Sequence, residues 1–428
     1  METILILALM IGLMLGGLWI HFAVGISAIV YILAIQGTIG LKSLGLVSWG
    51  AADSYTLSAI PLFVLMAEIL LGSGLSSRLY TAISPLVRRL PGGVLNTNIF
   101  GCAVFAAVSG GSSSTAAAIG TVALPELGRL GFNKRLAAGS LAAGGTLGIL
   151  IPPSITMIVY ATFTETSIPK LFMAGIVPGL VLALLYVVYI MARSIANPAL
   201  APRAAEQGQG SLLQSLRDLL PFATLIGLVM GSIYGGVATP TEAGAIGVVC
   251  ALVIAGGYRT LSVEILTTAL RRTLVMSGNI LFIVFVSLLF AYATALTGFG
   301  ETLAEWLRDA GLSRLEFLLA ALFFYAILGC FMEGLGMIAI TIPILFPTLA
   351  LYGIDPIWFG IFVVLLVELG QLTPPLGVIL FVVASSWREL KVEDVVAGTA
   401  PFFAIIVLFI FLLIAFPEIA LWLPGQMR

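Results

Sequence analysis

The sequence predicts an all-α polytopic membrane protein that contains an inverted repeat with two re-entrant helical hairpins and two broken helices. Three observations support this class. Of the 428 residues, 60% are hydrophobic and 9% are charged, whereas an average soluble domain is about 45–50% apolar and about 25% charged. Apolar runs approach the length of about 20 residues that a membrane crossing needs. Glycine-rich and Pro-Pro interruptions recur in the same order in both halves. A soluble protein is excluded.

Ten apolar runs predict crossing segments, and two further apolar stretches are interrupted at their middle. The ten runs are 3–20, 22–40, 57–73, 136–164, 171–192, 219–236, 242–257, 273–298, 357–386 and 400–422. The interrupted stretches, 92–127 and 315–349, leave arms of roughly 12–18 residues, which are too short to cross alone. Since non-helical backbone at membrane depth persists only inside protein or facing a cavity, both stretches are predicted to be re-entrant hairpins.

The basic residues predict the topology. With the N-terminus outside and both hairpins returning to their own side, fourteen of the nineteen basic residues lie inside, in agreement with the positive-inside rule. These are Arg78, Arg88, Arg89, Arg129, Lys134, Arg135, Arg193, Arg203, Arg217, Arg259, Arg271, Arg272, Arg388 and Lys391. The five outside are Lys42, Lys170, Arg308, Arg314 and Arg428. Both termini are therefore predicted on the outer side.

A polar stretch divides the chain into two halves of similar pattern. Gly110 precedes Pro152 by 42 positions, and Gly334 precedes Pro374 by 40. Such repeats with helices broken at the membrane midplane are typical of secondary transporters. The predicted organisation is scaffold helices, a first repeat core, a cytoplasmic linker, scaffold helices and a second repeat core, over residues 1–90, 91–192, 193–218, 219–298 and 299–428.

The first interruption, 108–115, combines two glycines with five hydroxyl side chains. Glycine lets the backbone turn and approach a ligand closely, and neutral oxygens suit a hard cation. Helix ends at such a tip also direct N–H groups at an anion. The alternative is a packing seam of small residues between helices.

Each Pro-Pro pair interrupts a long apolar segment and has a hydroxyl residue beside it. Proline removes a backbone donor and breaks a helix, which frees carbonyl oxygens. Ser154 follows Pro152-Pro153, and Thr373 precedes Pro374-Pro375. A simple structural kink is the alternative, although two pairs at corresponding positions favour a shared role in ion binding.

Four carboxylates lie in apolar surroundings, where a charge is costly and usually functional. Glu333, beside the second glycine tip, is the strongest candidate for a cation site. Glu368 either serves coupling or accepts hydrogen bonds from the broken backbone. Glu242 suits a helix N-terminus, and Glu68 suits an interhelical contact. No Walker loop occurs, and the five aspartates lie outside the predicted spans. ATP hydrolysis and membrane-embedded catalysis are disfavoured, as is a passive channel.

Several motifs resemble the large membrane subunit of the tripartite ATP-independent periplasmic (TRAP) transporters. They are SGGSSSTAAAIG, GTLGILIPPS, LFMAGIVPG, GGVATPTEAGAIGV and ELGQLTPPLG, spread between about Pro61 and Pro401. The resemblance implies an elevator-type fold of the ion-transporter superfamily in a bacterial or archaeal inner membrane. It also implies Na⁺-coupled uptake, a small four-helix membrane partner and a periplasmic substrate-binding protein. Because the chain begins directly with membrane segments, the small partner is expected to be a separate chain.

The resemblance also implies roles for individual residues. One sodium site would use Ser109, Gly110 and Ser112 of the first tip with Gly148, Pro152 and Ser154 of its break. A second would use Glu333 and Gly334 with Gly370, Thr373 and Pro374. Substrate would lie near Ser113, Ser114 and Thr115. Many family members carry Asp where this chain has Glu333, which leaves direct ligation there open.

The expected function is Na⁺-driven import of a small organic anion. A C4-dicarboxylate, a sialic acid or a sugar acid would fit equally. The first alternative is a sodium/carboxylate symporter of the same superfamily that needs no binding protein, and a membrane-embedded enzyme is the remote one.

Overall fold

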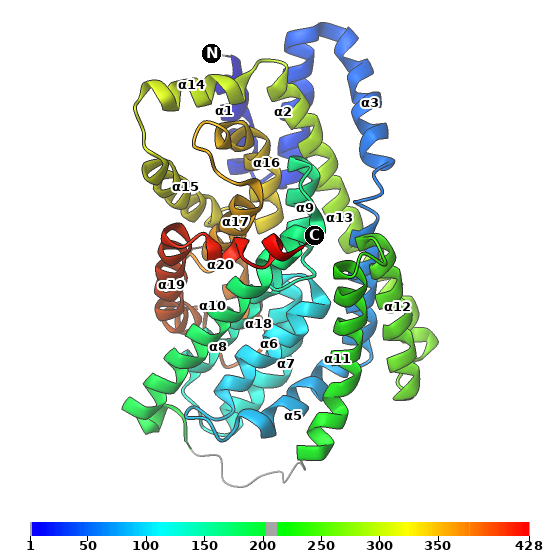
Figure 1. Ribbon diagram of the computed structural model, residues 1–428, viewed down its shortest axis with the longest axis vertical. Coiled ribbons are helices and arrows are strands. Elements are labelled where there is room, and N and C mark those ends of the chain that lie inside the picture. Colours follow the sequence, from blue (N-terminus) through cyan, green and yellow to red (C-terminus); the bar gives the residue numbers. More distant parts are fainter. Residues whose placement is uncertain (1, 203–211, 376, 428) are drawn as a thin grey trace.

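The computed structural model describes residues 2–202, 212–375 and 377–427, and every regular element in these ranges is helical. The middle of the predicted linker 193–218, together with Arg203 and Arg428, lies outside the described residues. At the edges of this linker, α10 runs to Ala196 and α11 begins at Leu212. Figure 1 shows the arrangement of the helices.

The N-terminal part contains five helices and one short 3₁₀ turn. These are α1 (Glu2–Leu15), α2 (Ile20–Gln36), η1 (Gly37–Gly40), α3 (Leu41–Ala52), α4 (Ala59–Gly72) and α5 (Leu75–Val87). Helices α4 and α5 meet at 73°. Gly74 supplies the left-handed backbone at this corner, with φ of 68°, a conformation that glycine adopts without steric cost.

The first predicted hairpin and the first predicted broken helix are both present as pairs of short helices. The hairpin consists of α6 (Leu95–Ser109) and α7 (Ser112–Arg129). The predicted crossing 136–164 is divided into α8 (Lys134–Thr146), η2 (Leu147–Ile149) and α9 (Ile155–Thr164), and α10 (Ile168–Ala196) follows. The interruptions fall at Gly110 and at Pro152-Pro153, where the sequence pattern places them.

The second half begins with three long helices and the shorter α14, and then follows the same order of hairpin, broken helix and long helix. The first elements are α11 (Leu212–Tyr234), α12 (Pro240–Gly257), α13 (Val263–Ala295) and α14 (Phe299–Asp309). The hairpin is α15 (Arg314–Gly329) and α16 (Gly334–Leu345), which η4 (Phe346–Leu349) extends. The remainder is α17 (Pro356–Gln371), α18 (Val378–Ser385), α19 (Val392–Ala415), α20 (Glu418–Leu421) and η5 (Pro424–Gln426). The Pro152-Pro153 and Pro374-Pro375 peptide bonds are both cis.

Fewer single helices have crossing length than the ten predicted segments. Among the described residues, six helical stretches are long and apolar enough, or seven if the bent α4–α5 pair is one span. The six are Ile20–Ala52, Ile168–Ala196, Leu213–Tyr234, Pro240–Gly257, Val263–Ala295 and Val392–Ala415. The predicted segments 136–164 and 357–386 consist of shorter helices because of their breaks. The first helix ends at Leu15, so the segment 3–20 is shorter than predicted.

Two helices differ from the sequence-based expectation. Helix α14 was not predicted, and it separates α13 from the second hairpin. Its Trp306 is exposed, and its acidic and basic side chains follow a helical period that marks an amphipathic surface helix. Helix α3 has no buried residue and packs beside α13, in a stretch for which the sequence predicted no crossing segment.

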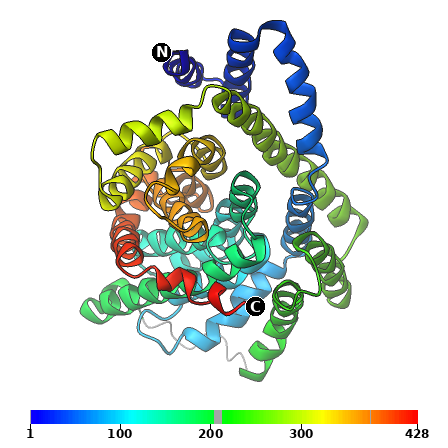
Figure 2. The same cartoon turned by 45° about the horizontal axis from the view of Figure 1, so that its top comes forward.

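The helices form two groups that pack against each other. One group contains α2, α4, α11, α12 and α13, with α12 and α13 on α4 and α13 on α2. The other contains the hairpins, the broken helices, α10 and α19, and it occupies the left and centre of Figures 1 and 2. The groups meet mainly where α13 contacts α16 and where α4 contacts α6. The predicted division into scaffold and repeat cores remains a prediction.

Each hairpin packs against the broken helix of the other half. The second arm of the first hairpin, α7, lies on α18, and the second arm of the other hairpin, α16, lies on α9. In the same way α19 packs on α8 and α10 packs on α17. The two halves therefore form one continuous core, in which α17 is buried over most of its length.

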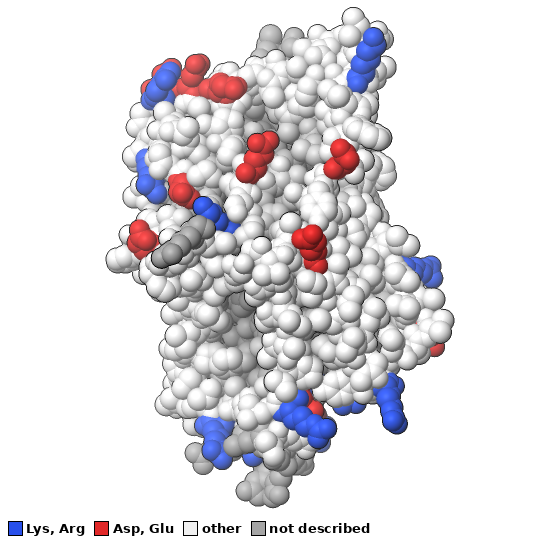
Figure 3. Space-filling model, turned by 45° about the vertical axis from the view of Figure 1, so that its right-hand side comes forward, with Lys and Arg blue, Asp and Glu red and all other residues white. Residues whose placement is uncertain are grey.

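Charged side chains are sparse on the surface and unevenly distributed. Figure 3 shows one face on which a group of Lys and Arg side chains lies at the lower end, with most acidic side chains above it. On this face the zone between the acidic side chains and the lower basic group is largely uncharged, as contact with lipid requires.

Candidate functional site

The first glycine tip lies directly on the first broken helix. Gly110 ends α6 in a left-handed conformation, with φ of 63°. Its carbonyl oxygen accepts a hydrogen bond of 3.1 Å from the N–H of Ile155, the first residue of α9. The tip of the hairpin is thereby joined to the start of the second half of the broken helix.

Hydroxyl groups gather around the carbonyl oxygen of Gly111. Thr115 donates to this oxygen at 2.7 Å and Ser114 at 3.0 Å, while the Ser109 and Thr115 hydroxyls are 2.6 Å apart. Ser109 and Thr115 are buried, as is Ser112 at the start of α7, and Ser113 is half-buried. The five hydroxyls predicted from the sequence therefore lie at one tip, three of them out of contact with solvent.

Gly148 faces this tip from the break. A Cβ atom at Gly148 would lie 2.4 Å from the Gly111 carbonyl oxygen and 2.7 Å from Thr115 Oγ1. Only glycine therefore permits this contact between η2 and the tip.

Pro152 and Ser154, the other predicted residues of the break, are buried beside it. The Ser154 hydroxyl donates to the Ile149 carbonyl at 2.6 Å and accepts from the Met157 N–H, which caps α9. Predicted tip and predicted break are thus adjacent in the first half.

The second tip contacts the second break in a corresponding way. A Cβ atom at Gly329 would lie 2.1 Å from Gly370 Cα, so α15 and α17 cross in backbone contact. A Cβ atom at Gly334 would lie 2.7 Å from Gln371 Nε2. The Cys330 thiol donates to the Pro374 carbonyl at 3.2 Å, a contact that the sequence analysis missed.

Polar groups at the second break are fewer than at the first. The Thr373 hydroxyl donates to the Leu369 carbonyl of its own helix at 2.8 Å. Glu333 precedes α16 as its N-cap residue without a side-chain cap, and it is exposed. Its carboxylate is the charged group nearest in sequence to Gly334 and stands at the surface of the tip.

Two of the four carboxylates in apolar segments have structural partners. Glu68 is buried on α4 and forms an ion pair of 3.6 Å with Arg272 of α13, which confirms an interhelical contact. Glu242 and Thr239 form a reciprocal capping box at the start of α12, with the Glu242 carboxylate accepting the Thr239 N–H at 2.8 Å. The interpretation of Glu242 as a helix N-terminal residue is confirmed.

Glu368 differs from these because it is completely buried on α17. Both carboxylate oxygens lack a hydrogen-bond partner among the described residues, and so do the buried Tyr186 hydroxyl and the Gln371 side-chain oxygen. The predicted hydrogen bonds from the broken backbone to Glu368 are absent from the described residues. Since burial of an unpartnered polar group costs free energy, polar groups of this kind at the centre of the core indicate a functional region.

A polar network at the start of α6 was not predicted from the sequence. Buried Asn98 of α6 accepts from the Tyr80 hydroxyl at 3.2 Å and donates to the Ser140 hydroxyl at 2.9 Å. It thereby joins α5, α6 and α8. The Asn-Thr-Asn run at 96–98 inside an apolar stretch is the sequence signal that could have identified it.

The chemistry available at both interruptions is that of carbonyl and hydroxyl oxygens held in a mostly apolar core. Hard cations prefer such oxygens. Among the described residues, no group of three or more His, Cys, Asp or Glu side chains comes together. The carbonyl and hydroxyl oxygens of the two interruptions are the groups that could hold a hard cation, and the N–H groups at the helix starts are available to an anion.

Comparison with known proteins gives full-length relatives. Residues 7–419 match the family described as the DctM component of the tripartite ATP-independent periplasmic transporters. The C4-dicarboxylate TRAP transporter large permease protein DctM of Pseudomonas aeruginosa is 36% identical over 90% of each chain. Its counterpart from Rhodobacter capsulatus is 33% identical over 99% of each chain.

A solved transporter structure shares the fold. The Alcanivorax borkumensis YdaH transporter superposes with a TM-score of 0.60, covering 92% of this chain and 91% of its own, at 18% identity.

Proposed function

The chain belongs to the DctM family of tripartite ATP-independent periplasmic transporters, and from this we propose that it imports a small organic anion in symport with Na⁺. Large permeases of this family work with a small membrane subunit and a periplasmic binding protein. We place this chain in the inner membrane with both termini on the periplasmic side. The family match favours delivery by a binding protein over a symporter that works alone.

One observation carries the proposal: in each half a glycine tip lies against a Pro-Pro break. At such a junction two helices end, so carbonyl oxygens and N–H groups are released from helical hydrogen bonding. The first junction adds a cluster of hydroxyls around Gly111. Carbonyl and hydroxyl oxygens are ligands that a hard cation prefers, which supports a Na⁺ site here.

The two junctions provide the proposed sodium sites. The first consists of Ser109, Gly110, Ser112, Gly148, Pro152 and Ser154. The second consists of Glu333, Gly334, Gly370, Thr373 and Pro374. At the first site the buried hydroxyls of Ser109 and Ser112 supply neutral oxygens. At the second, Glu333 supplies negative charge from the surface of the tip.

The substrate is proposed to bind near Ser113, Ser114 and Thr115 at the start of α7. No Lys or Arg occurs within the tips or breaks, so an anion there would rely on hydroxyls, on N–H groups of the helix start and on Na⁺ nearby. The two relatives reported above are named for C4-dicarboxylates, which supports a carboxylate as the substrate.

Transport is proposed to follow an elevator mechanism. The hairpins and broken helices of both halves pack into one core beside the group formed by α2, α4 and α11–α13. Movement of this core against the long helices would carry both junctions across the membrane together. The recurring order of elements and the reciprocal packing of the halves support an inverted repeat.

Uptake in proteoliposomes tests the proposal. The chain is reconstituted with its small membrane partner and its binding protein, and labelled carboxylate uptake is measured with and without an inward Na⁺ gradient. We expect saturable uptake that requires both the binding protein and the gradient. Uptake that is indifferent to Na⁺ would refute the coupling, and uptake without the binding protein would favour the independent symporter.

Removing a hydroxyl at either junction should weaken Na⁺ dependence. For Ser109→Ala and Thr373→Ala we expect the Na⁺ concentration at half-maximal uptake to rise about tenfold, since a hydrogen-bonding or ligating group lost to a charged partner costs about 1.5–3 kcal/mol. The measurement is the initial uptake rate over a Na⁺ series at saturating substrate.

Thr267→Ala is the matched control for the hydroxyl variants. Thr267 donates to the Val263 carbonyl one turn earlier on α13, as Thr373 does to Leu369, but it is exposed and far from both junctions in the sequence. An unchanged Na⁺ dependence in both junction variants would show that these residues serve packing only.

A further inference from the structure

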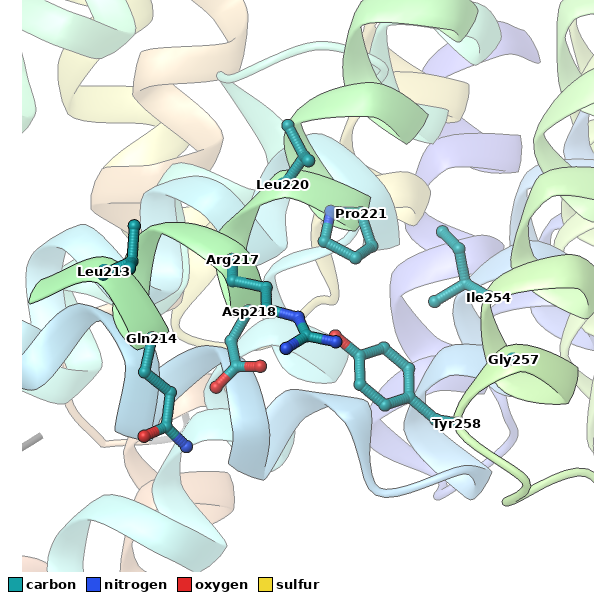
Figure 4. A pocket seen from close by; sticks show the side chains of 9 residues that line it. All are labelled: Leu213, Gln214, Arg217, Asp218, Leu220, Pro221, Ile254, Gly257 and Tyr258. Carbon is teal, nitrogen blue, oxygen red and sulfur yellow. The ribbon is translucent and has the colours of Figure 1, made fainter. Parts of the chain in front are cut away.

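A pocket at the ends of α11 and α12 has no part in the proposed transport site. It has a volume of about 680 Å³. Figure 4 shows the side chains that line it: Leu213, Gln214, Arg217, Asp218, Leu220, Pro221, Ile254, Gly257 and Tyr258. The first six belong to the first turns of α11, and the others lie at the end of α12.

One part of the pocket is basic. The Arg217 guanidinium extends toward Tyr258 in Figure 4, and it forms no ion pair within the described ranges. Arg78 of α5 is not part of the lining, but its guanidinium lies 4.7 Å from the centre of the Tyr258 ring. Arg259 follows Tyr258 directly. Within the lining the charges of Arg217 and Asp218 balance. Arg78 and Arg259 beside Tyr258 add positive charge at the edge of the pocket, and this charge favours an anion.

The other part of the pocket is apolar and open to the surroundings. Leu213 is 77% exposed and Leu220 is 63% exposed, and Pro221 and Ile254 continue the apolar lining. A phospholipid has a charged phosphate next to apolar acyl chains. The cations here suit the phosphate group, and the exposed apolar surface beside them suits the beginning of an acyl chain.

The position along the membrane agrees with this character. Arg78, Arg217 and Arg259 all belong to the basic residues that the charge distribution places on the inner side. On this predicted topology the pocket lies where inner-leaflet headgroups meet the hydrocarbon, the level at which basic pockets between helices bind anionic lipid headgroups.

We propose that this pocket binds one anionic phospholipid of the inner leaflet. Arg217 in the lining and Arg78 next to Tyr258 attract the phosphate, and the acyl chains lie along Leu213, Leu220 and Ile254. A water-soluble phosphate would leave this apolar surface exposed, whereas a lipid covers it. The site is independent of Na⁺ coupling, so its test does not depend on the proposed transport mechanism.

Lipid binding to the purified chain tests this site. The protein is delipidated in neutral detergent, and native mass spectrometry follows titration with phosphatidylglycerol or with phosphatidylcholine. We expect phosphatidylglycerol to bind at least about tenfold more tightly than phosphatidylcholine, since each basic residue near the membrane surface contributes about fivefold to the affinity for an anionic lipid. The double variant Arg217→Gln/Arg78→Gln should remove this preference. Arg217→Lys/Arg78→Lys keeps the charge and should retain most of the preference.

Two controls separate the pocket from general surface charge. Arg271→Gln/Arg388→Gln removes two exposed arginines of the same predicted side outside the pocket and should leave the preference unchanged. Inorganic phosphate at millimolar concentration should not displace the lipid. Equal loss in both double variants would overturn the proposal, as would displacement by phosphate, which would indicate a site for a free anion. A preference that persists in Arg217→Gln/Arg78→Gln would place the lipid elsewhere.

Discussion

Gly148→Ala is expected to reduce substrate uptake by at least tenfold. The new methyl group would meet the Gly111 carbonyl oxygen at 2.4 Å and Thr115 Oγ1 at 2.7 Å, distances that no carbon atom tolerates without displacement of its neighbours. The first tip must therefore move away from the break, which separates the groups of the proposed sodium site. A displacement of about 1 Å at a binding centre can cost roughly a hundredfold in rate.

The measurement is the initial rate of uptake in proteoliposomes that contain equal amounts of reconstituted protein. Gly278→Ala is the matched control, because a Cβ atom at this position of α13 meets nothing within 4 Å. The thermal unfolding midpoint of both variants shows whether the loss is one of function or of folding, since overpacking costs about 1–3 kcal/mol. Normal uptake by Gly148→Ala would mean that the tip and the break are not in functional contact.

Gly398→Ala is expected to lower the stability of the folded protein more than other single methyl additions. Helices α8 and α19 cross in backbone contact, with a Cβ atom at Gly398 only 1.9 Å from the Arg135 carbonyl oxygen. A Cβ atom at Gly139 would lie 2.0 Å from the Gly398 oxygen. Small residues at a helix crossing allow close packing inside a membrane, and no flexible side chain is present here to move aside. We expect a loss of about 3 kcal/mol, the upper end of the range for overpacking.

Unfolding in detergent, followed by intrinsic fluorescence against temperature, measures this loss. Gly256→Ala on α12 is the control, because its Cβ atom meets nothing within 4 Å. Alanine is about 1 kcal/mol more favourable than glycine in a helix, so the control should be neutral or slightly more stable. Identical midpoints for Gly398→Ala and Gly256→Ala would contradict a backbone contact between α8 and α19.

The hairpins and broken helices could be predicted because their interruptions are local. A glycine tip or a Pro-Pro pair ends a helix by its own backbone properties, so the ends of α6 and α8 follow from neighbouring residues. The role of Glu242 could be predicted for the same reason, since a capping box involves residues three positions apart. The partner of Glu68 could not, because Arg272 is distant in the sequence and only packing brings α4 beside α13.

Other features depend on tertiary contacts that a single sequence does not encode visibly. Apolar length alone does not distinguish a continuous helix from two consecutive shorter helices, so six or seven single helices of crossing length among the described residues are compatible with the ten predicted crossings. Helix α14 was not predicted because its charged residues interrupt the apolar pattern of a membrane span. The helical spacing of those charged residues nevertheless identifies a surface helix. The hydrogen bond between Gly110 and Ile155 joins segments whose proximity the motifs suggested, but the atoms involved follow only from the fold.

The reciprocal packing of the two halves has a consequence for biogenesis. Since α7 packs on α18 and α9 packs on α16, the first half leaves the insertion machinery before the helices that complete its core have been synthesised. The first hairpin therefore lies in the bilayer without these partners until the last third of the chain has been inserted. A chain that ends after α10 therefore exposes the surfaces of α7 and α9 that α18 and α16 cover in the folded protein.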